Sequence, residues 1–100
     1  MASSKSYLEY VLEQSSGLEN IAYKPMMGEY ILYYEGKIFG GIYDDRLLVK
    51  DTPSARRLMP DAPRELPYPG AKEMLLVEEI DDRAFLGRLL CEMIAELPKK

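Results

Sequence analysis

The stretch from Glu29 to Lys50 constrains the fold more than any other part of the chain. Aromatic and β-branched residues, which favour extended strands, dominate three short runs within it. The runs are EYILYYE (29–35), IFGGIY (38–43) and RLLVK (46–50). Gly36-Lys37 and Asp44-Asp45 separate them and are typical of tight turns. We therefore expect an antiparallel meander at the centre of the protein.

Two adjacent glycines, Gly40 and Gly41, stand inside the second run, where side chains should pack. They could form a phosphate-binding loop, a β-bulge or a place where another element approaches the backbone. A phosphate loop needs glycines between a strand and a helix N-terminus, and no helix follows closely here. A bulge or a close approach is favoured, and we expect Gly40 to make room for a helix. Gly28 is also expected to be structural.

Both faces of the meander are apolar. Strict alternation places Leu32, Ile38 and Ile42 on one face, which we expect the helices to cover. The other face then lacks a cover, because so short a chain has no second layer of helices. An exposed apolar face of this size indicates an interface for a second copy or another protein, unless its aromatic residues simply tolerate half-exposure. The predicted interface residues are Ile31, Tyr33, Phe39, Tyr43 and Leu48.

Helical patterns flank the meander. Apolar residues recur at helical spacing over 4–16, where Ser6 and Glu9 resemble a capping box. Thr52-Pro53 starts a short helix, a last strand is expected over 72–78, and Asp81 or Asp82 caps the longest helix. A short run over 21–24 could be a further strand. Together they predict an α+β fold: a two-layer α/β sandwich with helices on one face of a mostly antiparallel sheet, forming one domain over 1–100.

Composition narrows the function. The chain has 17 acidic and 13 basic residues and a net charge of -4, so we expect no direct contact with nucleic acid. The single Cys91 cannot form an intrachain disulfide. No apolar segment reads as a secretion signal or a membrane span, so we expect a cytoplasmic protein without a membrane partner.

Catalytic groups are scarce. The chain has no histidine, which removes imidazole bases and histidine-ligated metals. Asp44-Asp45 and the acidic residues of 78–82 fit turn and helix-cap roles better than catalysis or metal binding. We expect no cofactor and no enzymatic activity.

Several motifs resemble a known family. They are Met26-Met27-Gly28-Glu29-Tyr30, Gly40-Gly41-Ile42-Tyr43-Asp44-Asp45 and the tract from Met59 to Gly70. These and most of the chain are similar to the N-terminal domain of the TfoX/Sxy family, regulators of bacterial natural competence. The resemblance implies an α-β(3)-α-β(2)-α fold like that of secretion chaperones, which often dimerises. The full-length regulators also carry a helical C-terminal domain, which these 100 residues do not include.

Two classes of function remain. The first is a non-enzymatic regulatory or protein-interaction module that acts as a homodimer or with a protein partner. The alternative is a small-ligand-binding domain, or an unrecognised enzyme that uses carboxylates, tyrosines or an anion site near Thr52. A deep polar pocket would favour the alternative, and a flat tyrosine-rich face would favour the first.

Overall fold

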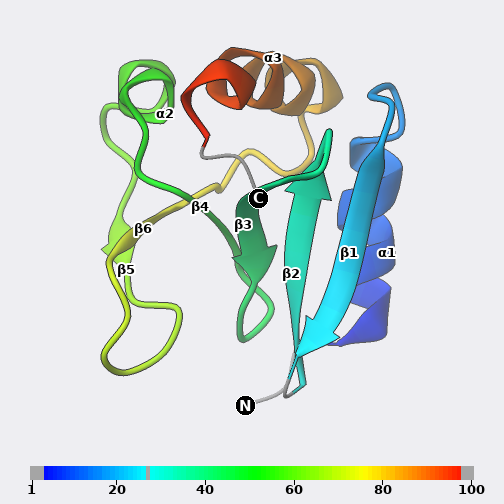
Figure 1. Ribbon diagram of the computed structural model, residues 1–100, viewed down its shortest axis with the longest axis vertical. Coiled ribbons are helices and arrows are strands. Elements are labelled where there is room, and N and C mark those ends of the chain that lie inside the picture. Colours follow the sequence, from blue (N-terminus) through cyan, green and yellow to red (C-terminus); the bar gives the residue numbers. More distant parts are fainter. Residues whose placement is uncertain (1–3, 27, 98–100) are drawn as a thin grey trace.

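A computed structural model describes residues 4–26 and 28–97 of the chain. In this part of the protein one antiparallel sheet of six strands has the order β1-β2-β3-β4-β6-β5 (Figure 1). The strands are β1 (Ile21–Met26), β2 (Glu29–Tyr34), β3 (Lys37–Ile42), β4 (Leu47–Val49), β5 (Arg64–Glu65) and β6 (Met74–Leu76). The helices are α1 (Lys5–Gln14), α2 (Pro53–Leu58) and α3 (Arg83–Met93), and a 3-10 turn η1 (Ile94–Glu96) follows α3. The predicted α+β fold is confirmed, with β1 as an additional strand before the meander.

Each α-helix begins at a side-chain cap. The hydroxyl of Thr52 accepts a hydrogen bond from the backbone N–H of Ala55, and the carboxylate of Asp82 accepts one from Phe85. In α1 the capping residue is Ser4, not the predicted Ser6. Ser4 has the extended backbone that a cap needs, whereas Ser6 already lies inside the helix.

The three helices share one core with one face of the sheet. Helix α1 contributes Leu8 and Val11, whereas α3 contributes a stripe that ends at Met93. The buried residues that the sheet contributes to this core are Leu32, Tyr34, Phe39, Ile42, Leu47, Val49 and Leu75. We call this side of the sheet the inner face and the opposite side the outer face. Since α1 and α3 each bury an apolar stripe against the same face, and α2 adds Ala55 to the same core, the predicted two-layer arrangement follows.

A β-bulge in β3 changes which residues share a face. Leu32 pairs with Gly40, but the next residue, Tyr33, pairs with Ile38, so Phe39 is an extra residue without a partner. The bulge turns Phe39 into the core, where it is 2% exposed, and moves Ile38 to the outer face beside Tyr33. The predicted facing of Phe39 and Ile38 is therefore wrong, because strict alternation does not survive a bulge.

The paired glycines are explained by neighbouring backbone and one aromatic ring. A Cβ on Gly40 would lie 2.1 Å from the carbonyl oxygen of Leu48, so the space belongs to strand β4 and not to the helix that we expected. A Cβ on Gly41 would lie 2.6 Å from the carbonyl oxygen of Tyr30 and 2.7 Å from the ring of Tyr43. Gly28 has a φ of 85°, a conformation that suits glycine.

The chain covers part of its own outer face. Tyr43 lies against Gly41, and the ring of Tyr68 packs on it with a centroid distance of 6.4 Å. Leu48, which pairs with Gly41, is fully buried. The prediction that Phe39, Tyr43 and Leu48 lie on an uncovered surface is therefore wrong. Phe39 is turned inward by the bulge, and the connector between β5 and β6 brings Tyr68 onto Tyr43.

Candidate protein-binding surface

Two of the predicted interface residues remain accessible. Ile31 and Tyr33 lie on the outer face of β2, and both are half-buried. Their cross-strand partners in β3 are Gly41 and Ile38. The structure thus brings Ile31, Tyr33 and Ile38 together in a small apolar area, while the other predicted interface residues are buried. That area alone is smaller than the interface that the sequence predicts.

Strand β1 is an open edge of the sheet. It comes first in the strand order, so within the described residues it pairs on one side only, with β2. The carbonyl oxygen of Asn20 accepts a hydrogen bond from the N–H of Glu35. Because backbone groups alternate in an antiparallel ladder, those of Ile21, Tyr23 and Pro25 point away from β2. Pro25 therefore lacks its N–H at a position where the ladder does not need one.

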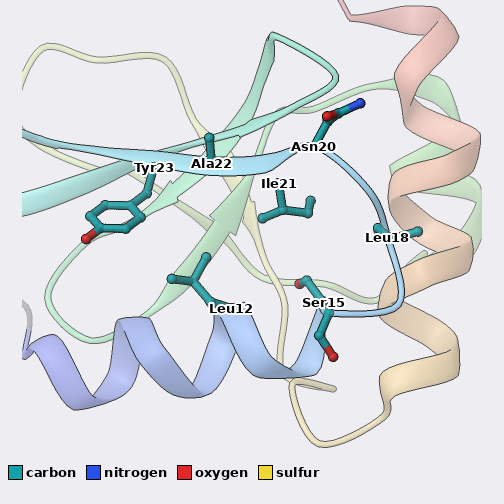
Figure 2. A pocket seen from close by; sticks show the side chains of 8 residues that line it. Leu12, Ser15, Leu18, Asn20, Ile21, Ala22 and Tyr23 are labelled. Atoms are coloured by element: carbon teal, nitrogen blue, oxygen red, sulfur yellow. The ribbon is translucent and has the colours of Figure 1, made fainter.

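A groove lies beside this open edge on the inner face, between β1 and the C-terminal half of α1. Its volume is about 480 Å³, and its lining includes Leu12, Leu18, Ile21 and Tyr23. Figure 2 shows Leu12 pointing from the helix toward the strand, and Ile21 and Tyr23 pointing from the strand toward the helix. Ala22 points to the opposite side of the strand in the same view. Alternate side chains of a neighbouring strand would meet this groove.

Large apolar side chains at the edge are more exposed than such residues usually are. Tyr23 is 43% exposed and Met26 is 41% exposed. The ring of Tyr23 makes an edge-to-face contact with Tyr30, at a centroid distance of 5.8 Å. The contact favours this position of the ring, which places an exposed apolar surface next to the outward backbone groups of β1.

The anion site that the sequence allowed near Thr52 is filled by the chain itself. Thr52 uses its hydroxyl to cap α2, and Glu96 reaches the same helix start. The N–H of Ser54 donates to Glu96 at 3.0 Å, and its hydroxyl donates to the same carboxylate at 2.8 Å. These two bonds, the backbone one first, lower the pKa of Glu96. An external anion would have to displace this carboxylate.

Other chemical sites are not assembled in the described part of the chain. Its Cys, Asp and Glu side chains form no group of three or more that could hold a metal ion. Cys91 is exposed, with its sulfur 3.8 Å from the hydroxyl of Tyr34. The acidic pair Asp44 and Asp45 forms the turn that the sequence predicted, and both residues have positive φ.

Comparison with known proteins identifies the family. The family model of the TfoX N-terminal domain, which describes the sequences of that family, matches residues 13–84 of the chain. The chain belongs to this family. It is also similar to an uncharacterized 12.7 kDa protein encoded in the trpE 5′ region of Spirochaeta aurantia, with 32% identity over 84 residues, which are 84% of this chain and 73% of the relative. No solved structure matches the chain. Within residues 4–26 and 28–97, no helix is both long and apolar enough to cross a bilayer.

Sequence reasoning did not find the open edge or the groove. The signal for β1 was a short apolar run ended by Pro25, which is weak evidence for a strand of any kind. The groove depends on where α1 packs relative to β1, and a pattern within either element does not show that. A proline inside a strand does indicate an edge, and that signal was available at Pro25.

Proposed function

We propose that this domain is a non-enzymatic regulatory module that binds another protein at the open edge of β1. The observation that carries the proposal is the free backbone of Ile21 and Tyr23 lying beside an apolar groove. Exposed sheet edges bind extended peptides by adding a strand, in which backbone bonds supply affinity and side-chain pockets supply specificity. Here β1 supplies the outward backbone groups, and β1 and α1 together supply the apolar groove.

The geometry sets the form of the partner. An added strand would exchange backbone hydrogen bonds with Ile21 and Tyr23, and it would use the carbonyl oxygen of Pro25 only as an acceptor. Every second side chain of the partner would point to the inner face, toward Leu12 and Leu18. The partner is therefore an extended segment with apolar residues at alternate positions. A second copy of the chain is one protein that could supply it.

The regulatory part of the proposal rests on the family. The resemblance to regulators of natural competence implies a regulatory role, and a role in transcription through protein contact is consistent with a net charge of -4. We propose a cytoplasmic protein that acts on a protein component of the regulatory machinery and not on DNA. Fluorescence anisotropy with duplex DNA at low salt tests the last point, and we expect no binding.

Tyr23 provides a matched pair of variants for the edge. Tyr23→Ala removes the ring alone, whereas Tyr23→Pro also removes the outward N–H. Since this N–H faces solvent, both variants should keep the β1–β2 ladder and the circular dichroism spectrum of the wild type. Tyr68→Ala, which changes an exposed tyrosine away from β1, is the control.

The assay is affinity capture from bacterial lysate, followed by hydrogen exchange on any complex recovered. We expect a captured protein to slow exchange at Ile21 and Tyr23, to persist with Tyr68→Ala and to be lost with Tyr23→Pro. Light scattering shows whether a second copy is the partner, in which case Tyr23→Pro gives a monomer. Equal capture by folded Tyr23→Pro, or protection confined to other strands, would refute binding at this edge.

A further inference from the structure

A second groove lies on the outer face of the sheet, apart from the edge of β1. Its volume is about 540 Å³, within the range of about 300 to 1,000 Å³ that small-molecule pockets occupy. Ile38, Gly40 and Tyr43 of the β3 region line it from the sheet, and the connector between β5 and β6 lines it with Pro67 and Tyr68. Lys50 to Thr52, Ala71 to Met74 and Glu96 to Leu97 also line it.

The charges in this groove are unevenly paired. Lys50 and Lys72 both line it, and in the described part of the chain neither ammonium group has an ion pair or a hydrogen bond, although the backbone of Lys50 bonds to Phe39 and Thr52. Two of the three carboxylates that line it have partners within the chain. Asp51 binds Arg64 at 2.5 Å and Arg56 at 2.9 Å, and these bonds lower its pKa, with Arg64 the larger cause.

The remaining two carboxylates, Glu96 and Glu73, differ in their contacts. Glu96 accepts both hydrogen bonds from Ser54. Glu73 has no ion pair or hydrogen bond among the described residues, although after Asp51 its charge contributes to the raised pKa of the Arg64 guanidinium. The groove therefore leaves two ammonium groups and one carboxylate available to a ligand, and positive charge prevails among them.

An aromatic surface borders the same groove. The ring of Tyr68 is 53% exposed and packs on the buried ring of Tyr43 at an angle of 57°. The contact with Tyr43 leaves about half of Tyr68 accessible, so a flat apolar group can pack against the exposed part of its ring. Met74 and Leu97 add further apolar lining.

We propose that this groove binds a small ring-bearing carboxylate, with the ring on Tyr68 and the carboxylate held by the lysine ammonium groups. The size, the aromatic surface and the two unpaired cations each match this class of ligand. A neutral ligand would leave both ammonium groups unused. The site is independent of the proposed strand addition at β1, so the failure of either leaves the other standing.

The test compares an acid with its neutral analogue. Indole-3-acetate and indole-3-acetamide share a ring and differ in one charge, and each is titrated into isotope-labelled protein while amide resonances are followed by NMR. We expect saturable shifts at Gly40, Tyr68 and Lys72 with the acid, and binding of the amide weaker by roughly tenfold. Lys50→Gln and Lys72→Gln should each weaken binding of the acid to a similar extent and leave binding of the amide unchanged.

Lys24→Gln is the matched control, because Lys24 is an exposed lysine on β1 outside the groove. It should bind the acid as the wild type does. Tyr68→Ala should weaken both compounds, since the ring contact does not depend on charge. Equal affinity for acid and amide, shifts that map to the α1–β1 groove, or no saturable shift up to about 10 mM acid would each overturn the proposal.

Discussion

Replacing Gly40 by alanine should disrupt the centre of the sheet. The new Cβ would lie 2.1 Å from the carbonyl oxygen of Leu48 and 2.8 Å from the Cα of Val49, whereas real Cβ contacts essentially never fall below 3.0 Å. Strand β4 would have to move by about 0.9 Å, and both obstructing atoms are backbone, so no side-chain rotation relieves the clash. The clash therefore weakens the pairing of β3 with β4 beside the bulge.

The size of this effect follows from known costs of overpacking. Forcing extra atoms into a packed interior, backbone shifts included, costs typically about 1 to 3 kcal/mol and occasionally more, and a clash this close with backbone atoms belongs at or above the upper end. Alanine also stiffens the unfolded chain, which offsets about 0.4 to 1 kcal/mol. We therefore expect Gly40→Ala to lower the free energy of unfolding by about 2 to 3 kcal/mol, a large share of the roughly 5 to 15 kcal/mol typical of a domain.

Urea unfolding followed by circular dichroism measures this loss. With a slope of about 1 to 1.5 kcal/mol/M, the midpoint should fall by about 2 M. Gly17→Ala is the control, because a Cβ there meets no atom within 4 Å, and its midpoint should change little or rise. If Gly40→Ala unfolds at the same urea concentration as Gly17→Ala, the close approach of β4 does not exist as described.

Two further predictions concern the helix start and the outer face. Glu96→Gln should destabilise the protein near neutral pH, since the Ser54 bonds hold the pKa of Glu96 below its ordinary 4.5. The carboxylate stabilises the fold above pH 4.5 and loses this effect as the pH falls through its lowered pKa. The stabilities of the wild type and Glu96→Gln should therefore become equal in acid, and thermal unfolding at a series of pH values measures this. A constant difference down to about pH 2 would contradict this. Leu48→Ala should cost about 2 to 5 kcal/mol because the residue is fully buried, and Ile31→Ala should cost less in the same urea assay. Equal losses would mean that the outer face is open at Leu48.

The elements of the fold could be predicted because their signals are local. Thr52 followed by proline marks a helix start within two residues, and Asp82 precedes the apolar stripe of α3. The two-residue turn at Asp44 and Asp45 separates strands in the same way. Each of these features depends on residues that are adjacent in the sequence, so a local sequence pattern is enough to predict it.

Which face of the sheet a residue occupies, and where the candidate site forms, depend on contacts between segments that are far apart in the sequence. A local sequence pattern does not show such contacts. The bulge at Phe39 lies next to Gly40, where β4 approaches closely, and it reverses the side on which Ile38 lies. The cover over Tyr43 comes from Tyr68, which is 25 positions further along the chain. Distant segments decide such features, which is why the predicted interface retained only Ile31 and Tyr33.

The proline in the outermost strand also limits how far the sheet can grow. An unprotected edge can template the stacking of one copy on another without end, which leads to fibres. Pro25 removes one of three outward donors, and the charged Lys24 sits beside it. A short guest strand can still attach at the two positions that remain. The same edge that admits one partner is thus a poor seed for aggregation.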